Sequence, residues 1–394
     1  MIARLQVDFE IPEDLKMVQS LVRDFVHDQL KPLERDVLGR AAGLKDARAY
    51  LPPETEDRLM KMATDIGLWG LGVPEDLGGM GLSTLGNCLA EEEIAQTIVP
   101  FSFGDVTPIL FECNAEQRER CFLPHFRRQR QAYIALLEPQ DRTGFPNMRA
   151  RAVKADSDYI ITGRKMSFSR PGEDYFAIVF ATTGDDGKEP TCFLVDKDSP
   201  GFTVTSAEDA VGWRTQIKSP LSLTFADCRV PAQNILGQPG QAFHLGQKWL
   251  PARRLVRGAR CVGVGQRLLE EAKAHVESWQ SYGQHLYKRP GIESALADIA
   301  VSIHACRLVV YEAAWKADSS TNVKREAAMV KLFATQMIRT VADRVSHVFN
   351  GPPYIQGLPM QRLCSDALAA NATDLALELQ SSIIASDIMK GLKV

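Results

Sequence analysis

One carboxylate, Asp374, lies between small residues and a leucine-rich run in the stretch AANATDLALELQ near the carboxyl end of the chain. A carboxylate placed in this way could remove a proton from a substrate as a general base. It could equally stabilise the start of a helix, because Asn371 is a good N-cap and an acid three residues later favours the positive end of a helix. From these residues alone, both roles remain open.

Four arginines lie within eight residues in the stretch WLPARRLVRGAR, at positions 253, 254, 257 and 260. Cations this close together repel one another unless anions are near. The stretch is therefore either the solvated basic face of a helix or a segment whose charges meet acidic side chains or an anionic ligand. No arginine can serve as the general base, since the guanidinium cannot accept a proton.

Several other kinds of site have no support in the sequence. It contains no GxGxxG after a strand-like run, no P-loop and no HExxH, which argues against nicotinamide, ATP and zinc chemistry. The eight cysteines are scattered without CxxC spacing, so we expect buried free thiols and neither disulfides nor a metal site. His304 lies in the apolar run VSIHACRLVV, and we expect it to be a core histidine and not a ligand.

Length and charge limit the class of protein. At 394 residues the chain exceeds the usual size of one hydrophobic core, so two or three packed units are expected. Lysine and arginine number 46 against 49 aspartate and glutamate, without a long block of like charge, so neither nucleic acid nor an anionic membrane is indicated as a partner. The N-terminus lacks the apolar core of a signal peptide, and no window of 18 apolar residues occurs, so we expect a cytoplasmic protein.

Three regions with different periodicity would have to position these side chains. Residues 1–130 are mostly helical in pattern, interrupted by the glycine-rich stretch GLWGLGVPEDLGGMGLS. Residues 131–239 change to short runs rich in valine, isoleucine, phenylalanine and threonine between turn residues, which predicts a small β-barrel or sandwich. Residues 240–394 return to helical periodicity, with four segments long enough for a four-helix bundle.

Several motifs, in one consistent order, make the chain resemble the acyl-CoA dehydrogenase family over nearly its whole length. They are GLWGLGVPEDLGGMGL, then LLEP followed by YIITGRKMSFS, then FADCRVPAQNILGQPGQAF and finally HVFNGPPYIQGLP. The resemblance implies an N-terminal helical domain, a middle β-barrel and a C-terminal four-helix bundle. It also implies an oxidoreductase of fatty acid metabolism that uses FAD to oxidise an acyl-CoA at Cα–Cβ to the 2-enoyl-CoA, with flavin N5 receiving the hydride.

The resemblance gives roles to residues already noted. By register with the family, Asp374 falls where the catalytic base is usually a glutamate, and a subgroup of the family carries aspartate there. Aspartate is one methylene shorter, which costs about 1–1.5 Å of reach at a step that is sensitive to position. The other position where relatives carry their base is Arg253, which cannot accept a proton. Arg254 matches a family arginine close to the substrate.

The same resemblance marks a set of flavin-binding positions. Ser169 keeps a hydroxyl that can donate to flavin N5. Leu137 stands where the family often has threonine or serine, and Ser167 replaces a tryptophan whose ring lies beside the flavin in the family. Trp279 replaces an arginine that meets the pyrophosphate, which removes a bidentate contact and predicts weakened or rerouted FAD binding. The positions assigned to the cofactor are Leu136, Leu137, Thr143, Phe168, Ser169, Trp279, Tyr282, His347 and Gly351.

Three functions remain open at this point. The first is FAD-dependent oxidation of an acyl-CoA, with an electron acceptor such as an electron-transfer flavoprotein. The second is a flavin oxidase that acts on a carbon acid without CoA. The third is a flavin-poor structural subunit that pairs with an intact homologue. In the family the dinucleotide half of FAD is held by the neighbouring subunit, so we expect a homodimer or homotetramer, or a heteromer with a homologue.

Overall fold

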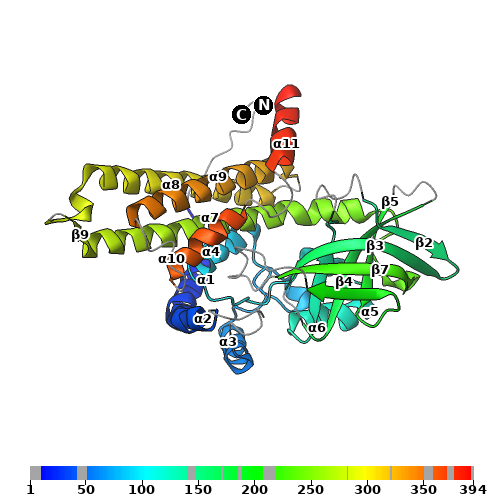
Figure 1. The fold of residues 1–394 in the computed structure, drawn as a ribbon. Coiled ribbons are helices and arrows are strands. Elements are labelled where there is room, and N and C mark those ends of the chain that lie inside the picture. Colours follow the sequence, from blue (N-terminus) through cyan, green and yellow to red (C-terminus); the bar gives the residue numbers. More distant parts are fainter. Residues whose placement is uncertain are drawn as a thin grey trace.

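Most helices gather on one side of the molecule and most strands on the other, and one long helix reaches across both parts (Figure 1). This arrangement is seen in a computed structural model of the chain. The residues that the structure describes are 10–41, 51–139, 148–169, 172–184, 189–206, 219–281, 283–319, 322–349, 358–370 and 377–391.

The N-terminal region consists of helices that surround an apolar core of their own. Helix α4 (Thr84–Ile94) is the central one, and it is capped by Ser83, whose Oγ accepts a hydrogen bond from the Gly86 N–H at 3.1 Å. The other described elements are α1 (Glu13–Phe25), η1 (Val26–Leu30), η2 (Lys31–Leu33), α2 (Glu34–Ala41), α3 (Pro53–Asp65), η4 (Glu75–Leu77), η5 (Pro108–Glu112), α5 (Ala115–Gln117), η6 (Arg118–Phe122) and α6 (Leu123–Phe126).

The glycine-rich stretch between α3 and α4 has structural reasons for its glycines. Gly70 and Gly78 adopt positive φ angles of 72° and 91°, which side chains with a Cβ rarely tolerate. A Cβ on Gly79 would lie 2.2 Å from the Val73 carbonyl oxygen. The stretch is therefore a close-packed turn in which backbone atoms of different residues are in direct contact.

The middle region folds into one eight-stranded sheet. Its strands are β1 (Gln131–Ala135), β2 (Arg151–Ala155), β3 (Asp158–Ser169), β4 (Tyr175–Thr183), β5 (Glu189–Asp196), β6 (Phe202–Ser206), β7 (Ser219–Pro231) and β8 (Ile235–Leu236). Within the described ranges they pair in the order β6-β7-β3-β2-β4-β5-β8, and β1 runs parallel to β4. Phe176, Ile178 and Phe180 of β4 join the core under the helices, while the residues between them join the second core of the sheet. Burial on both faces explains why β4 is apolar almost throughout.

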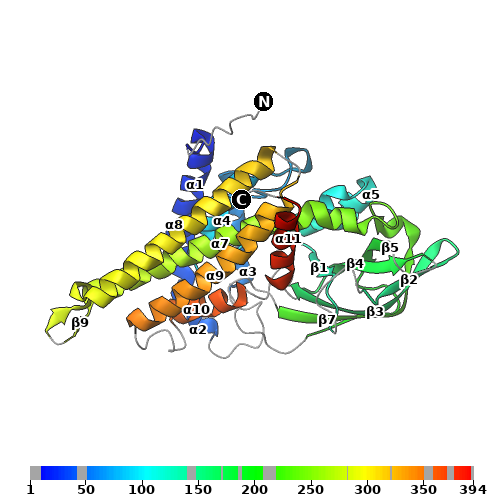
Figure 2. The same ribbon diagram turned by 90° about the horizontal axis from the view of Figure 1, so that it is seen from above.

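Three long helices of the C-terminal region lie side by side in both views (Figures 1 and 2). They are α7 (Ala242–Ser278), α8 (Pro290–Ser319) and α9 (Lys324–Phe349). Two shorter helices follow, α10 (Pro359–Ala369) and α11 (Leu377–Met389), and α11 stands across the direction of the long helices in Figure 1. Helix α7 approaches its neighbours closely. A Cβ on Gly258 would lie 2.3 Å from Val330 of α9, and one on Gly263 would lie 2.1 Å from the Glu92 carbonyl oxygen of α4. α7 therefore joins the N-terminal region to the bundle.

Helix α8 exposes much of its apolar surface. By length and composition alone it could cross a membrane, with a mean hydropathy of 1.4 in its most apolar window, of which 22% is buried. One such helix is weak evidence for a membrane span, because helices of soluble bundles pass the same test and α8 packs along α7 and α9. His304 lies on the exposed side of α8, away from the buried stripe that contains Ile303 and Cys306, so the prediction of a core histidine was wrong.

All eight cysteines lie within the described residues and are free thiols. Six of them are buried, and burial raises the pKa of the Cys228 thiol to about 11. Their interior positions and neutral state agree with the expectation of free thiols that serve the packing. In the part of the chain that the structure describes, no group of three His, Cys, Asp or Glu side chains could hold a metal ion.

Candidate functional site

The first segment assigned to the flavin ring follows β1 and is fixed against β3. The Met166 N–H of β3 donates a hydrogen bond to the Leu137 carbonyl at 2.8 Å. The Leu136 carbonyl accepts a second hydrogen bond from Lys165 Nζ at 3.2 Å. The structure thus brings Leu136 and Leu137 to the strand that carries the second flavin segment. We call this contact of residues 136–138 with β3 the β1–β3 junction.

A buried ion pair closes the β1–β3 junction. Lys165 is fully buried, and its Nζ lies 2.9 Å from Glu138 Oε1. The Glu138 carboxylate also accepts the backbone N–H groups of Arg149 and Ala150, the latter at 2.9 Å. Burial alone would raise the pKa of the Glu138 carboxyl, but the hydrogen bonds from Ala150 and Lys165 and the charge of Lys165 hold that pKa below its ordinary value. This pair was not predicted, although the alternation of β3 puts Lys165 on the same face as Tyr159 and Ile161, where a lysine signals a buried partner.

The second flavin segment is the last part of β3, where two hydroxyls face each other. Ser167 and Ser169 lie two residues apart on the strand, a rise of about 6.6 Å, yet their Oγ atoms are 2.9 Å apart. Both side chains are therefore turned toward one another. Their mutual bond uses one hydroxyl hydrogen, so the pair keeps a second hydrogen to donate to another acceptor.

The groups at the β1–β3 junction suit a flat and largely apolar ring with a few acceptor atoms. Leu136 is buried in the core below, while Phe168 and Ser169 are half-buried at the end of β3. Ser167, which is 2% exposed, lies deeper than Ser169. The accessible hydroxyl is thus the one that the resemblance assigns to flavin N5.

The positions assigned to the dinucleotide half lie at the far end of the bundle. Trp279 follows the last residue of α7, is 59% exposed and contacts the His275 ring at a centroid distance of 5.3 Å. The His275 ring in turn stacks on Phe349 of α9 at 4.3 Å. His347, near the end of α9, is exposed, with its Nε2 4.0 Å from Asp343 Oδ1. The structure therefore brings Trp279 and His347 to one tip, the tip where α7 and α9 end.

The two halves of the assigned flavin site lie far apart within one chain. Leu136 of the β1–β3 junction shares a hydrophobic core with Leu245, in the first turns of α7. Trp279 stands at the other end of the same helix, and 34 residues of α helix span about 50 Å. One dinucleotide cannot reach both places in a single copy of the chain.

The four arginines of the arginine-rich stretch on α7 are buried or half-buried, and none is fully exposed to solvent. Arg254 is buried. Arg260 Nη1 donates to Glu91 Oε1 of α4 at 2.9 Å. For Arg260, the structure supports the second interpretation that the sequence left open, an acidic side chain that balances the charge.

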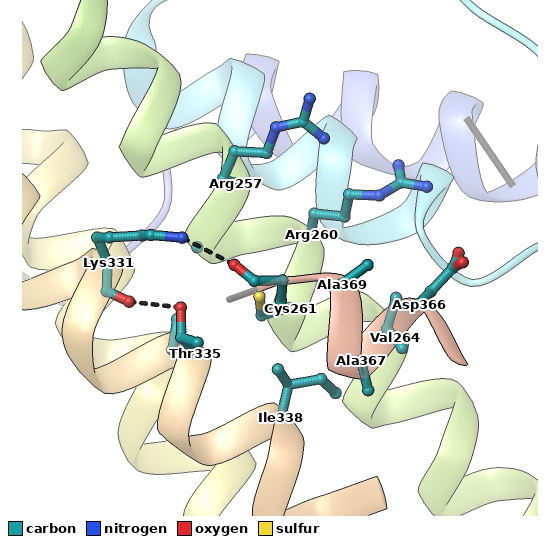
Figure 3. A pocket seen from close by; sticks show the side chains of 13 residues that line it. Arg257, Arg260, Cys261, Val264, Lys331, Thr335, Ile338, Asp366, Ala367 and Ala369 are labelled. Carbon is teal, nitrogen blue, oxygen red and sulfur yellow. Dashed lines mark hydrogen bonds between the residues drawn. The ribbon is translucent and has the colours of Figure 1, made fainter. Parts of the chain in front are cut away.

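A small cavity of about 50 Å³ lies between α7, α9 and α10 and is walled mostly by small apolar residues (Figure 3). Lys331 crosses it from α9, and its Nζ donates to the Ala370 carbonyl at 2.7 Å. Asp366 borders the same cavity from α10. Its Oδ1 atom is buried and has no hydrogen-bond partner among the described residues. Burial raises the pKa of the Asp366 carboxyl to about 8 despite the opposing charges of Arg260 and Arg362.

The cavity lies at the end of α10 that leads toward the predicted base. Ala370 is the last described residue before the stretch 371–376, which contains Asp374. The assigned residues that lie outside the described part of the chain are Thr143, Tyr282, Gly351 and Asp374.

Three family models match consecutive parts of the chain. Their descriptions are acyl-CoA dehydrogenase N-terminal domain for residues 12–128, middle domain for residues 134–226 and C-terminal domain for residues 241–389. The chain belongs to the acyl-CoA dehydrogenase family. The predicted family and fold class, a helical domain followed by a sheet domain and a helical bundle, are therefore confirmed. The Asp-for-Glu subgroup and the domain boundaries stay predictions.

Individual members of the acyl-CoA dehydrogenase family are similar to this chain over nearly its full length. The mitochondrial short-chain specific acyl-CoA dehydrogenase of Sus scrofa is 30% identical over 97% of this chain and 91% of its own. The structure of butyryl-CoA dehydrogenase from Megasphaera elsdenii matches with a TM-score of 0.80 at 24% identity, covering 97% of this chain and all of that one. An acyl-CoA dehydrogenase complexed with FAD from Bacillus anthracis matches with a TM-score of 0.79 at 20% identity, covering 97% of this chain and 68% of that one. At these identities the two structures show the shared fold alone.

Proposed function

We propose that this protein oxidises an acyl-CoA thioester at Cα–Cβ to the 2-enoyl-CoA, with FAD as its cofactor. The observation that carries the proposal is the β1–β3 junction, where the buried pair of Lys165 and Glu138 holds one flavin segment against β3, the strand that ends with the hydroxyl of Ser169. This junction belongs to a chain that the family models match over most of its length, from residue 12 to residue 389 with two short gaps. Similarity to a short-chain specific acyl-CoA dehydrogenase makes short acyl chains the first substrates to test.

The β1–β3 junction would hold the flavin ring. FAD, when bound, supplies the acceptor for the hydride that leaves the β-carbon. Ser169 would donate a hydrogen bond to the ring, and Leu136 and Phe168 would contact its apolar surface. At the position assigned to the pyrophosphate, Trp279 brings one N–H and no charge, so we expect weaker FAD binding than an arginine would give.

A second copy of the chain completes this site in our proposal. The junction and the Trp279 tip are separated by about 50 Å of α7. The tip would therefore contact the dinucleotide half of an FAD molecule whose flavin ring is held by another copy. Helix α8 offers a surface for such a contact, because apolar side chains such as Val301 and Leu308 are exposed on it. We therefore propose a homodimer or a homotetramer of such dimers, with a heteromer as the alternative.

Asp374 is our proposed catalytic base. It would remove the α-proton of the acyl thioester from the face opposite the flavin, where aspartate replaces the usual glutamate. Its chemistry requires an ionised carboxylate. Arg254, on α7, is the proposed substrate-site arginine.

Spectra of the purified chain test the proposal. We expect a yellow protein whose flavin bands bleach when butyryl-CoA is added without oxygen, with mass measurement showing at least a dimer. Asp374→Asn should keep the flavin content and abolish bleaching, because an amide cannot accept the proton. A colourless protein would favour the structural-subunit alternative.

The identity of the electron acceptor distinguishes the proposed dehydrogenase from a flavin oxidase. We propose an electron-transfer flavoprotein as acceptor, so turnover with butyryl-CoA should need an added acceptor and consume little dioxygen. Bleaching by a panel of carbon acids without CoA, combined with rapid dioxygen consumption, would support the oxidase instead. Full activity of the Asp374→Asn variant would reject the assignment of the base.

A further inference from the structure

Helix α8 carries a stripe of exposed residues that we call the α8 stripe, formed by Val301, His304 and Leu308. Val301 is 69% exposed, Leu308 is 42% exposed and His304 is exposed between them. Steps of three and four residues keep these side chains on one face of the helix. The guanidinium next to the stripe turns away from it, because Arg307 Nε donates to Glu92 Oε1 of α4 at 2.9 Å. Exposed apolar residues without Lys, Arg, Asp or Glu among them are typical of the centre of a protein interface.

The α8 stripe is centred on its helix. Helix α8 runs from Pro290 to Ser319, so Val301 lies 11 residues after its first residue and Leu308 lies 11 residues before its last. A two-fold axis through the middle of α8 therefore places Val301 of one copy on Leu308 of the other, with the two helices antiparallel. His304 lies nearest to that axis. The pattern matches itself when it is reversed, as a contact between two identical copies requires.

Close contacts show how α7 and α8 lie against each other within one chain. A Cβ on Gly258 would lie 3.1 Å from Val310, and one on Gly265 would lie 3.2 Å from Ile303. Residue numbers rise along α7 as they fall along α8, so the two helices are antiparallel. The start of α8 therefore lies at the Trp279 tip. Its end, nine residues beyond Val310, lies level with the first turns of α7, nine residues before Gly258.

We infer that two copies of this chain pair antiparallel through the α8 stripe, with Val301 of each copy on Leu308 of the other. The role of this pair in sharing FAD rests on the proposed function. In the pair, the start of one α8 meets the end of the other. The Trp279 tip of one copy then lies level with the first turns of the partner's α7, and these turns share a core with the β1–β3 junction through Leu245 and Leu136.

The α8 pair brings the two halves of the assigned flavin site closer together. Across the pair, three helix spacings of 8–10 Å separate one α7 from the other, which is at most about 30 Å. Within one copy, the tip and the junction are about 50 Å apart. One contact thus covers the exposed stripe and also sets the tip of each copy beside the sheet end of the other.

The size of the α8 contact suits part of a stable dimer. A helix of 30 residues is about 45 Å long and about 10 Å wide, so two paired copies of α8 would bury about 900 Å² in total. A specific interface needs about 1,000 Å² or more. The two Trp279 tips, each against the other copy, would supply the remainder.

Cysteine cross-linking of the full chain tests the pairing and its register. His304→Cys should give a disulfide-linked dimer on mild oxidation, because the two copies of this position meet at the axis. Val301→Cys alone should give none, since its two copies would lie about 10 Å apart along the helices, beyond the reach of a disulfide. The double variant Val301→Cys/Leu308→Cys should link the two positions, as peptide masses show, and the same spacing within one chain makes that link intermolecular. The wild type, whose eight cysteines are free thiols, is the control.

A charge in the α8 stripe tests the strength of the contact. Leu308→Glu should weaken self-association by at least about 100-fold, because each copy would bury an unpaired carboxylate. Sedimentation measures the change, and bound FAD should fall in the same samples. The matched control is Leu21→Glu in α1, because Leu21 is 44% exposed and lies outside α8. This control should keep the mass and the flavin content of the wild type.

The pairing is overturned if His304→Cys remains unlinked, if Val301→Cys alone forms the disulfide, or if Leu308→Glu keeps the wild-type mass. A monomeric wild type also overturns it, and binding of that monomer to phosphatidylcholine vesicles would assign the stripe to a lipid surface instead. A yellow, active wild type without the cross-links would remove the pairing alone. A wild type that links as expected, yet binds no flavin and does not oxidise butyryl-CoA, would remove the proposed function and leave the pairing.

Discussion

Replacing Lys165 by methionine should destabilise the sheet domain and release the flavin segment. Methionine has a similar length and no charge, so it leaves the Glu138 carboxylate buried without its cation and the Leu136 carbonyl without its donor. Removing one partner of a buried ion pair typically costs about 3–5 kcal/mol. Glu138 keeps the backbone N–H groups of Arg149 and Ala150, so we expect a loss near the lower end, about 3 kcal/mol. A loss of this size is a large fraction of the stability of an ordinary domain, about 5–15 kcal/mol.

The assay for this prediction is a double-mutant cycle at the ion pair. Urea unfolding of the wild type, Lys165→Met, Glu138→Gln and the double variant gives four free energies of unfolding. Because the double variant no longer buries an unpaired charge, it should be more stable than the sum of the two single losses predicts, by at least about 1 kcal/mol. FAD content measured on the same samples should fall in Lys165→Met. A single-variant loss below 1 kcal/mol, or additive losses, would refute the argument that the pair closes the junction.

The acid sensitivity of the same pair gives an independent measurement. The folded-state pKa of Glu138 is depressed, so its contribution to stability is present above the ordinary pKa of an unfolded glutamate and is lost as pH falls through the folded value. Removing the Lys165 charge raises that folded pKa. The Lys165→Met variant should therefore begin to lose stability at a higher pH than the wild type when both are titrated with acid.

Three further predictions concern other parts of the molecule. Arg267→Met should cost about 3–5 kcal/mol in urea unfolding, because Arg267 Nη2 lies 2.9 Å from Glu34 Oε2 and both side chains are buried. Ser167→Ala should leave FAD content unchanged and slow anaerobic flavin reduction by about 2- to 10-fold, since Ser169 loses its hydroxyl partner; an unchanged rate would contradict this. The folded pKa of Asp366 is raised, so the wild type should lose stability as pH rises from about 4 to 8, and Asp366→Asn should not show this loss; thermal midpoints of both proteins across this range measure it.

Residue types and their spacing were sufficient to predict the order of the helical and strand regions. The run YFAIVFATT predicted a strand, and β4 is apolar almost throughout because both its faces are buried. The glycine-rich stretch predicted an interruption of the helical pattern, and in the structure it is a turn in which Gly70 and Gly78 adopt positive φ angles. Register with the family placed Leu137 and Ser169 in different segments, and the structure brings these segments to the same end of β3.

The partners of charged side chains could not be predicted, because periodicity records which face a residue occupies and not what lies opposite. Lys165 pairs with an acid 27 residues earlier, and Arg260 pairs with Glu91, 169 residues away. Lys331 bonds a backbone carbonyl, which has no side-chain signal at all. His304 was assigned to the core because its neighbours are apolar, yet α8 exposes most of its apolar surface. Each of these contacts depends on how distant elements meet.

Because of the length of α7, the proposed assembly should allow two inactive variants to complement each other. Each copy gives its sheet end to one catalytic centre and its Trp279 tip to another, so damage at either end disables a different centre. Two inactive variants, one altered at Ser169 and one altered at the tip, should regain turnover when they are unfolded and reassembled together. Mixing two copies altered at the same end should restore nothing.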